Sequence, residues 1–163
     1  MSELEQLATR LQVLEDIEAI KKVKAEYWAH CDNGPNAQGI GALFAEDGVW
    51  DGGVDVFGRY EGRAAIEQMF AGASKVQPFS VHNVMNPIIE VNGDEATGQW
   101  YLFQPCTLTG EHGDQAVWGA ATYVDDYKRI NGVCKIQTLR VIVKFWTPYD
   151  QGWVEKRLIQ DAP

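Results

Sequence analysis

Tyr27, Asp32 and His82 are the residues of this sequence whose types and spacing could carry out acid–base chemistry. Tyr27 and Asp32 stand near the end of a long amphipathic segment, and His82 follows about fifty residues later in an apolar segment that we expect to be a strand. A histidine held by a carboxylate can take a proton from carbon or oxygen without a cofactor, and a phenol can donate a hydrogen bond to a substrate oxygen. The three residues therefore predict a catalytic site with His82 as general base, Asp32 as its orienting group and Tyr27 as hydrogen-bond donor.

Each of these residues also has a purely structural interpretation. His82 could be a core histidine whose ring bonds to the backbone, and Asp32 could be a solvent-facing turn residue before Gly34. Tyr27 lies on the apolar stripe of its segment, where packing alone would explain its ring. On a regular helix Asp32 would point about 140° away from Tyr27. Both can face one pocket only if the helix loosens at its end, near Gly34 and Pro35.

Composition limits the class of protein. The chain has 163 residues, 45% of them hydrophobic, with six tryptophans and a formal charge of −9. This length suits one domain over residues 1–163. The acidic balance argues against a nucleic-acid partner, and no apolar run approaches the roughly 20 residues that span a bilayer, so we expect neither nucleic acid nor membrane as a partner. Three cysteines without paired spacing and an acidic N-terminus without an apolar stretch predict a reduced cytoplasmic protein with no metal site.

The first part of the sequence predicts helices. Apolar residues at steps of three and four over residues 3–31 predict one long helix with a single buried stripe, which Asn33-Gly34-Pro35 would end. We expect a short helix over residues 39–45, a strand that begins at residue 49 and a third helix over residues 62–70. The stripe of the first helix consists of Leu4, Leu7, Leu11, Leu14, Ile17, Ile20, Val23, Tyr27 and Cys31.

The remaining sequence predicts strands. Asn92-Gly93 and Asn131-Gly132 are strong hairpin signals, and Pro87 indicates a bulge or an edge. Helices followed by long hairpins predict an α+β fold in which helices close one face of a curved, mostly antiparallel sheet. We expect the tail from about residue 147 to wrap over the surface or over a neighbouring subunit. The expected strands span residues 88–91, 96–103, 120–130 and 133–145.

Several segments together resemble the SnoaL-like branch of the nuclear transport factor 2-like superfamily. They are residues 43–50, 58–63, 82–83 and 123–129, and the resemblance extends from about Ile17 to Phe145. It implies a cone in which a strongly curved sheet wraps around a long N-terminal helix and encloses an apolar pocket. The superfamily includes scytalone dehydratase, bile-acid dehydratases, lindane dehydrochlorinase, ketosteroid isomerase and polyketide cyclases, so the fold alone does not define the reaction.

The resemblance also implies roles for particular residues. Dehydratase and dehydrochlorinase members have an aspartate near the end of the first helix and a histidine on the third strand, as Asp32 and His82 are placed here. Bile-acid dehydratases have a tyrosine five residues before that aspartate, which corresponds to Tyr27. Some members have an arginine on the last strand, which suggests Arg140 as a substrate-binding residue.

Further substrate-binding candidates follow with less support from spacing. Gln104 stands near the place where some dehydratases carry an acidic residue on the fourth strand, whereas His112 falls in a loop-like stretch and does not replace the second histidine of scytalone dehydratase. Arg140 could instead form a cross-strand ion pair with Asp125 or Asp126. Six tryptophans exceed what packing needs, so we expect two or three to line the pocket, with candidates Trp28, Trp100 and Trp118.

The sequence therefore predicts a cofactor-independent lyase for a small hydrophobic, aromatic or polycyclic substrate, as in the catabolism of aromatic compounds. Elimination of water by a His82–Asp32 dyad is the main hypothesis. Three alternatives stay open: a retro-aldol lyase, such as one that releases formaldehyde from a lignin-derived diarylpropane; a ketosteroid-isomerase-like isomerase or polyketide cyclase; and a non-catalytic binding or assembly module. The resemblance further implies a homodimer or homotrimer, because a neighbouring subunit usually covers the outer face of such a sheet, near which we place Trp146 and Trp153.

Overall fold

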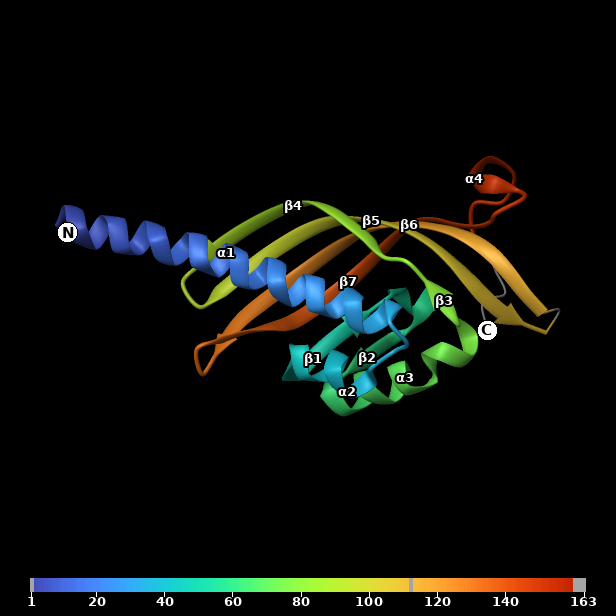
Figure 1. Ribbon diagram of the computed structural model, residues 1–163, viewed down its shortest axis with the longest axis horizontal. Helices are drawn as coiled ribbons and strands as arrows, with labels where there is room; N and C mark the ends of the chain where they lie inside the picture. The colour runs from blue at the N-terminus through green and yellow to red at the C-terminus, as the bar shows by residue number, and fades with distance from the viewer. Residues whose placement is uncertain (1, 112, 160–163) are drawn as a thin grey trace.

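A long N-terminal helix lies across one face of a curved seven-stranded sheet, and two shorter helices cover one end of it (Figure 1). The computed structural model describes residues 2–111 and 113–159. The helices are α1 (Glu3–Asp32), α2 (Ala37–Leu43), α3 (Arg63–Val76) and α4 (Gly152–Glu155), with a π-helical turn η1 (Gly53–Phe57). The strands are β1 (Phe44–Asp51), β2 (Arg59–Glu61), β3 (Phe79–Ser80), β4 (Asn83–Asn92), β5 (Glu95–Gly110), β6 (Gly113–Ile130) and β7 (Val133–Pro148).

The sheet has the strand order β2-β1-β7-β6-β5-β3, and β4 also pairs with β5. The pairs are antiparallel except for the parallel pair of β1 and β7. Hairpins of long strands, β5–β6 and β6–β7, form the centre of this sheet and bend around α1 (Figure 1). The expected α+β architecture with a mostly antiparallel, curved sheet is therefore confirmed.

Both predicted hairpins are present, but the first turns at Gly93-Asp94, one residue later than expected, because Asn92 still pairs with Glu95. Asn131 and Gly132 have φ angles of 51° and 78°, as a two-residue hairpin turn with two left-handed residues requires. At Pro87 the register between β4 and β5 shifts between Met85 and Ile88, so the expected bulge is confirmed. A third hairpin joins β5 to β6 between residues 110 and 113, although the sequence has no Asn-Gly pair there. His112, expected in a loop, lies outside the described residues.

Two helices differ from their expected limits. α2 begins two residues earlier than expected because the side chain of Asn36 caps it, accepting a hydrogen bond of 3.0 Å from the backbone N–H of Gly39. It also ends earlier, because Phe44 and Ala45 are buried at the start of β1. α3 continues to Val76, six residues beyond its expected end.

The expectation of one continuous buried stripe along α1 is wrong. The residues that α1 buries begin at Asp16 and include Ile20 and Tyr27, whereas Leu4 is 79% exposed. Leu4 and Cys31 are 27 residues apart, which is about 7.5 turns at 3.6 residues per turn, so the apolar series drifts to the opposite side of the helix. The first turns of α1 extend past the sheet into solvent (Figure 1). We call the exposed residues Leu4, Leu7, Leu11 and Leu14 the leucine stripe.

The described part of the tail returns to its own chain. Leu158 forms a parallel bridge with Trp146, and the backbone N–H of Ile159 donates to the Trp146 carbonyl at 2.8 Å. Trp146 is buried, contrary to its expected place at the outer face of the sheet, whereas Trp153 is 57% exposed. Contact of the tail with a neighbouring subunit stays a prediction.

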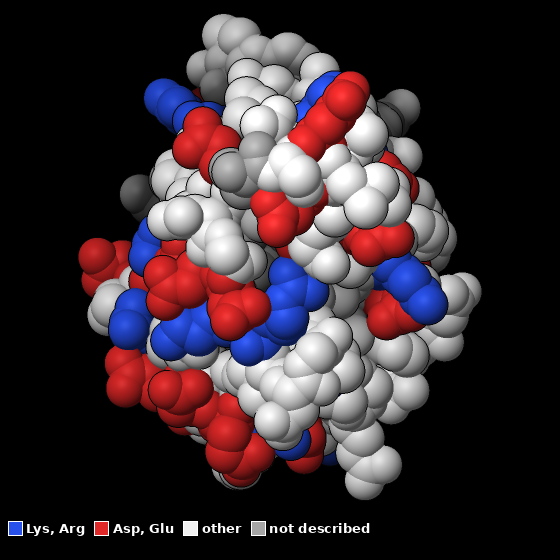
Figure 2. All heavy atoms as spheres, turned by 90° about the vertical axis from the view of Figure 1, so that its left-hand side faces the viewer, with Lys and Arg blue, Asp and Glu red and all other residues white. Residues whose placement is uncertain are grey.

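The surface mixes charges of both signs. Figure 2 looks onto the end of the molecule from which α1 projects and shows acidic and basic side chains side by side there. Among the described residues, none of the helices combines the length and the apolar character needed to cross a membrane.

The close contact between Gly119 on β6 and Trp146 on β7 allows a test of the fold. Gly119 pairs with Trp146, and a Cβ atom at Gly119 would collide with the indole ring. Replacing Gly119 by Ala should lower the free energy of unfolding by about 1–3 kcal/mol, measured by urea denaturation. Gly110→Ala is the matched control, since a Cβ atom there would meet nothing within 4 Å. Equal stabilities of the two variants would contradict the packing described here.

Candidate active site

A cavity of about 540 Å³ lies between the helices and the inner face of the sheet. Helices α1 and α3, strands β1 and β5–β7, and the turn η1 contribute to its walls. Most of its lining is aromatic or aliphatic, and among the described residues that line it there is no lysine, arginine, aspartate or glutamate. Representative wall residues are Trp50, Phe70, Tyr123, Val141 and Trp146.

His82 lines this cavity and is bound to Asp32. The ring Nδ1 of His82 is 2.5 Å from Oδ1 of Asp32, and the backbone N–H of His82 donates to Oδ2 at 2.8 Å. The hydroxyl of Ser80 donates to Oδ1 at 2.9 Å. The expected contact between His82 and Asp32 is thus present. A carboxylate at Nδ1 favours the tautomer with the proton on Nδ1, which leaves the lone pair of Nε2 free.

The surroundings of Asp32 favour its ionised form. Burial raises the pKa of this carboxyl, but the hydrogen bonds from the His82 ring, the His82 backbone and Ser80 outweigh burial and hold the pKa below its usual value. The side chains of His82 and Asp32 are 9% and 14% exposed. Asp32 is therefore a charged, largely enclosed partner for the ring.

The local chain path explains how Asp32 and Tyr27 both contribute. α1 stays regular to Asp32, where Asn33 caps it through two bonds to the Ala29 carbonyl, so the expected loosening of the helix end is wrong. Tyr27 faces the cavity, whereas Asp32 lies behind His82 and reaches the cavity only through that ring. The angle of about 140° between Tyr27 and Asp32 on the helix therefore does not prevent both from contributing to one site.

His82 occupies a break between strands rather than a strand. β3 ends at Ser80 and β4 begins at Asn83, and the backbone N–H of Val81 donates to the Pro105 carbonyl at 3.1 Å. Because His82 lies outside the ladder of the sheet, its backbone N–H is free to donate to Asp32. This break gives Asp32 two hydrogen bonds from one residue.

Tyr27 presents a neutral hydroxyl at the cavity. Its side chain is 2% exposed and accepts a hydrogen bond of 2.9 Å from the indole N–H of Trp50. Burial raises the pKa of Tyr27 well above its usual value. Since the indole uses a lone pair of the oxygen, the phenolic proton is left for another acceptor. Edge-to-face contacts with Phe44, Phe70 and Tyr123 fix the ring.

Gln104 lines the cavity as expected. It is 3% exposed, on the inner face of β5. The sequence did not single out Ser80, Trp50 or Tyr123. Ser80 could have been found, since it stands two residues before His82 in a segment that the sequence predicts to be a strand. No spacing signal marks Trp50 or Tyr123.

The three tryptophans expected at the pocket lie elsewhere. Trp28 follows Tyr27 by one residue, so it points about 100° away from it. Trp118 lies on the outer face of the sheet, where it stacks on Phe103 with ring centres 5.2 Å apart. Trp100 is on the inner face but is packed in the core, 6% exposed, without lining the cavity. The tryptophans that line it are Trp50 and Trp146.

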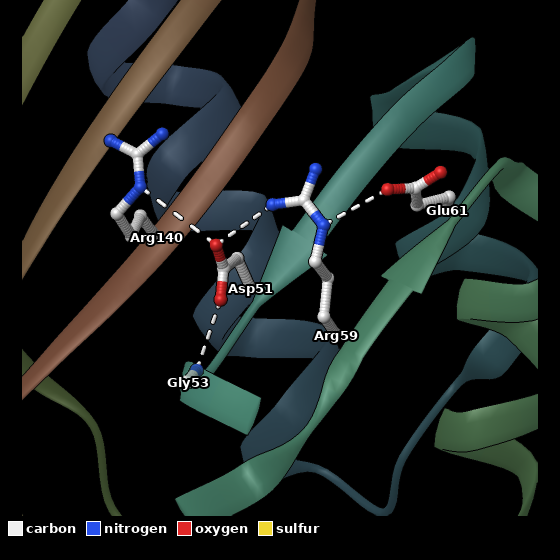
Figure 3. A network of polar contacts seen from close by, with 5 residues as sticks. All are labelled: Asp51, Gly53, Arg59, Glu61 and Arg140. Atoms are coloured by element: carbon white, nitrogen blue, oxygen red, sulfur yellow. Dashed lines mark hydrogen bonds and ion pairs between the residues drawn. The ribbon is translucent and has the colours of Figure 1, made fainter. Parts of the chain in front are cut away.

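Arg140 does not face the cavity either, which corrects its expected role. Leu139 and Val141 point inward from β7, so alternation directs Arg140 outward, with its side chain 43% exposed. Its Nε lies 3.9 Å from Oδ2 of Asp51 (Figure 3). The alternative cross-strand partner is also wrong, because Val124 stands opposite Arg140 on β6.

Asp51 is the centre of this outer network. Arg59 donates to Oδ2 of Asp51 at 2.9 Å and to Glu61 at 2.9 Å, and the backbone N–H of Gly53 donates to Oδ1 of Asp51 at 3.0 Å (Figure 3). The network therefore fixes the start of η1, whose Phe57 lines the cavity. Arg140 belongs to the support of the cavity wall and not to its interior.

A buried ion pair lies behind the tyrosines of the cavity. Lys24 and Asp125 are 1% and 0% exposed, with Nζ 2.8 Å from Oδ2, and the hydroxyl of Tyr127 donates to the same oxygen at 2.8 Å. The ammonium lies 3.4 Å from the ring centre of Tyr123 and 5.3 Å from that of Tyr27. Burial lowers the pKa of Lys24 and raises that of Asp125. Cation–π contacts with the rings of Tyr27 and Tyr123 thus compensate for part of the hydration that the Lys24 ammonium loses on burial.

A strongly bent sheet closed by a long helix is the nuclear transport factor 2-like fold, and here a histidine–carboxylate pair lies at its apolar cavity. The sequence matches the SnoaL-like domain family over residues 12–140, and the chain belongs to that family. This confirms the resemblance found in the sequence.

Solved structures share the fold. Hexachlorocyclohexane dehydrochlorinase (LinA) type 2 is 22% identical, with 90% of this chain and 93% of that chain covered and a TM-score of 0.73. A Novosphingobium aromaticivorans protein that bears the provisional name scytalone dehydratase is 23% identical, with 83% and 89% covered and a TM-score of 0.71. A protein of unknown function from Nostoc punctiforme is 24% identical, with 78% and 90% covered and a TM-score of 0.64. At these identities the likeness establishes the fold, and the similar structures include a dehydrochlorinase as well as a protein of unknown function.

The buried pair generates a prediction about stability. Lys24→Met should lower the free energy of unfolding by about 3–5 kcal/mol at neutral pH, because it leaves the Asp125 carboxylate buried without a counter-charge. The loss should shrink as the pH falls, since a carboxyl whose pKa is raised on folding binds a proton and stabilises the folded state at low pH. The double variant Lys24→Met/Asp125→Leu should recover most of the loss. Urea denaturation at several pH values checks this, and a double variant weaker than Lys24→Met alone would refute it.

Proposed function

We propose that this protein is a cofactor-independent lyase that eliminates water from an uncharged, hydrophobic β-hydroxy carbonyl compound. The observation that supports this most is the position of His82, which meets an apolar cavity while its Nδ1 is bound to the ionised Asp32. A base fixed in this way can take a proton from carbon without a cofactor. Membership of a family that contains dehydratases and a dehydrochlorinase is consistent with the same class of reaction.

In the proposed reaction, Nε2 of His82 removes the proton from the carbon next to the substrate carbonyl. Tyr27 donates its phenolic hydrogen to the carbonyl oxygen and stabilises the enolate that forms, an interaction worth a few kcal/mol in a site without water. The enolate then re-forms the carbonyl as the carbon–oxygen bond at the β-position breaks. The imidazolium of His82 returns the proton to the departing hydroxide, so that one base serves both steps and water is released.

A single base is favoured by the composition of the cavity. Among the described residues that line it, His82 is the one with an imidazole, the side chain that most often acts as a general base. Tyr27 stays protonated, because burial raises its pKa. Proton removal and proton return by the same ring require both groups to leave from one face of the substrate.

The substrate class follows from the walls. An apolar cavity without a charged lining group disfavours a carboxylate, a phosphate or a coenzyme A ester, because each would lose its hydration without a counter-charge. The volume of about 540 Å³ lies within the range of sites that enclose drug-sized molecules. Trp50, Phe70 and Trp146 offer faces and edges for aromatic rings. An uncharged molecule with one or two aromatic rings fits these conditions.

Kinetics of variants test the assignment of roles. With the aldol adduct of acetophenone and benzaldehyde as substrate, His82→Gln and Asp32→Asn should each lower kcat/KM by about 10²–10⁴, since the base is lost or its ring is released. Tyr27→Phe should lower it by about 10² through the missing donor. His30→Gln makes the same chemical change away from the cavity and should keep full activity. An Asp32→Asn variant with the full rate would contradict the mechanism.

The same substrate separates elimination from its alternatives. Loss of water yields chalcone, whereas abstraction of the hydroxyl proton would yield benzaldehyde and acetophenone by retro-aldol cleavage. We expect chalcone, measured by its absorbance and by mass spectrometry. Benzaldehyde and acetophenone in place of chalcone would assign the protein to the carbon–carbon lyases. Binding of this and related adducts without turnover would favour a binding module.

A further inference from the structure

The leucine stripe of α1 is an apolar surface that the rest of the chain does not cover. Leu4, Leu7, Leu11 and Leu14 are 79%, 50%, 56% and 60% exposed, and the residues that α1 buries begin only at Asp16. Single exposed leucines are common at protein surfaces, but a contiguous set on one side of a helix marks an interaction site.

The stripe points away from the sheet. On a regular helix Leu7 and Leu11 lie about half a turn from Ile20 and Tyr27, which face the core. Figure 1 shows this part of α1 extending past the strands. The chain's own sheet therefore cannot cover the stripe.

This part of α1 is helical from its first residue although it has no core to pack on. A capping box starts it: the hydroxyl of Ser2 accepts from the backbone N–H of Glu5 at 3.3 Å, and the Glu5 carboxylate accepts from the Ser2 backbone N–H at 2.7 Å. This part continues the packed half of α1, but most of the stability of a helix in a protein comes from the packing of its apolar face. A partner for the stripe would supply that packing.

We propose that the leucine stripe is a self-association surface, on which α1 of a second copy packs in parallel as a short two-stranded coiled coil. The spacing of three, four and three residues places Leu4 and Leu11 at position a of a heptad and Leu7 and Leu14 at position d. At position 18 the next a residue would be Glu18, which ends the seam.

Charges beside the stripe fit a parallel pair. Arg10 falls at position g and Glu15 at position e, the positions that form ion pairs between two parallel helices. Neither side chain forms an ion pair with another residue in the described parts of the chain. In the parallel pair, Arg10 of each copy faces Glu15 of the other.

The arrangement is also sterically open. Because the sheet lies on the side of α1 opposite the stripe, two copies joined along their stripes place their sheets on opposite sides of the paired helices. An anionic membrane is a poorer occupant, since Glu3 and Glu5 stand at the free end of the helix and the chain carries a net charge of −9. This seam is a different interface from the outer face of the sheet, which a neighbouring subunit would cover in the homodimer or homotrimer expected from the resemblance.

Sedimentation equilibrium of the full chain tests the surface. Leu7→Glu/Leu11→Glu should halve the mass of the assembly, whose subunit is 18.2 kDa, because four carboxylates would meet at the seam. Gln6→Glu/Thr9→Glu adds the same charge on the other side of the helix and should keep the wild-type mass. Tryptophan fluorescence of both variants should match the wild type, since no side chain of the stripe belongs to the core. An unchanged mass in Leu7→Glu/Leu11→Glu, or a wild type that is monomeric at high micromolar concentration, overturns the proposal.

Charge exchange and cross-linking test the orientation. Arg10→Glu should weaken the association and Arg10→Glu/Glu15→Arg should restore it, whereas failure of the second change to restore it contradicts the parallel pair. Leu7→Cys should form a disulfide between copies under mild oxidation, because equal d positions adjoin in a parallel coil. Phosphatidylglycerol vesicles are the remaining comparison: a wild type that binds them and stays monomeric in solution would assign the stripe to a lipid surface and overturn self-association.

Discussion

The arrangement of the site depends on the hydrogen bonds between Asp32 and the segment that joins β3 to β4. One carboxylate at the end of α1 receives the ring and the backbone N–H of His82 and the hydroxyl of Ser80. It therefore ties the central helix to the rim of the sheet at the place where the His82 ring meets the cavity. Hydrogen bonds to an ionised group are the strong ones among protein hydrogen bonds, and here three converge on one side chain. Loss of this carboxylate would release the helix end and the histidine together.

Much of this arrangement could be predicted from local sequence. Asn131-Gly132 and Pro87 specify backbone geometries that few other residues adopt, so their turns and bulge appear where expected. The pairing of His82 with Asp32 could be anticipated because a family pattern placed both residues. The direction of a side chain was harder to predict. Arg140 and Trp118 lie on strands with apolar residues on both faces, and there the alternation that separates inside from outside is not visible in the sequence.

The leucines of α1 show the same difficulty on a helix. Steps of three and four look like one stripe, but their mean is shorter than a helical turn, so a long series winds around the axis. Ile20 and Tyr27 therefore reach the core while Leu4 reaches solvent. The buried pair of Lys24 and Asp125 could not be foreseen either, because 101 residues separate its members and each looks like an ordinary surface charge.

The bond between Trp50 and Tyr27 has an optical consequence. The indole N–H donates to the same hydroxyl that we propose contacts the substrate, and the ring of Trp50 forms part of the cavity wall. Indole fluorescence responds to the polarity and hydrogen bonding of its surroundings. A molecule that displaces water from the cavity, or that accepts a hydrogen bond from the Tyr27 hydroxyl, should therefore change the fluorescence of Trp50. Trp146 shares the wall, whereas Trp28, Trp100, Trp118 and Trp153 contribute a background from elsewhere. The protein thus contains its own reporter of cavity occupancy, by which ligands of an unlabelled chain can be ranked before any turnover is known.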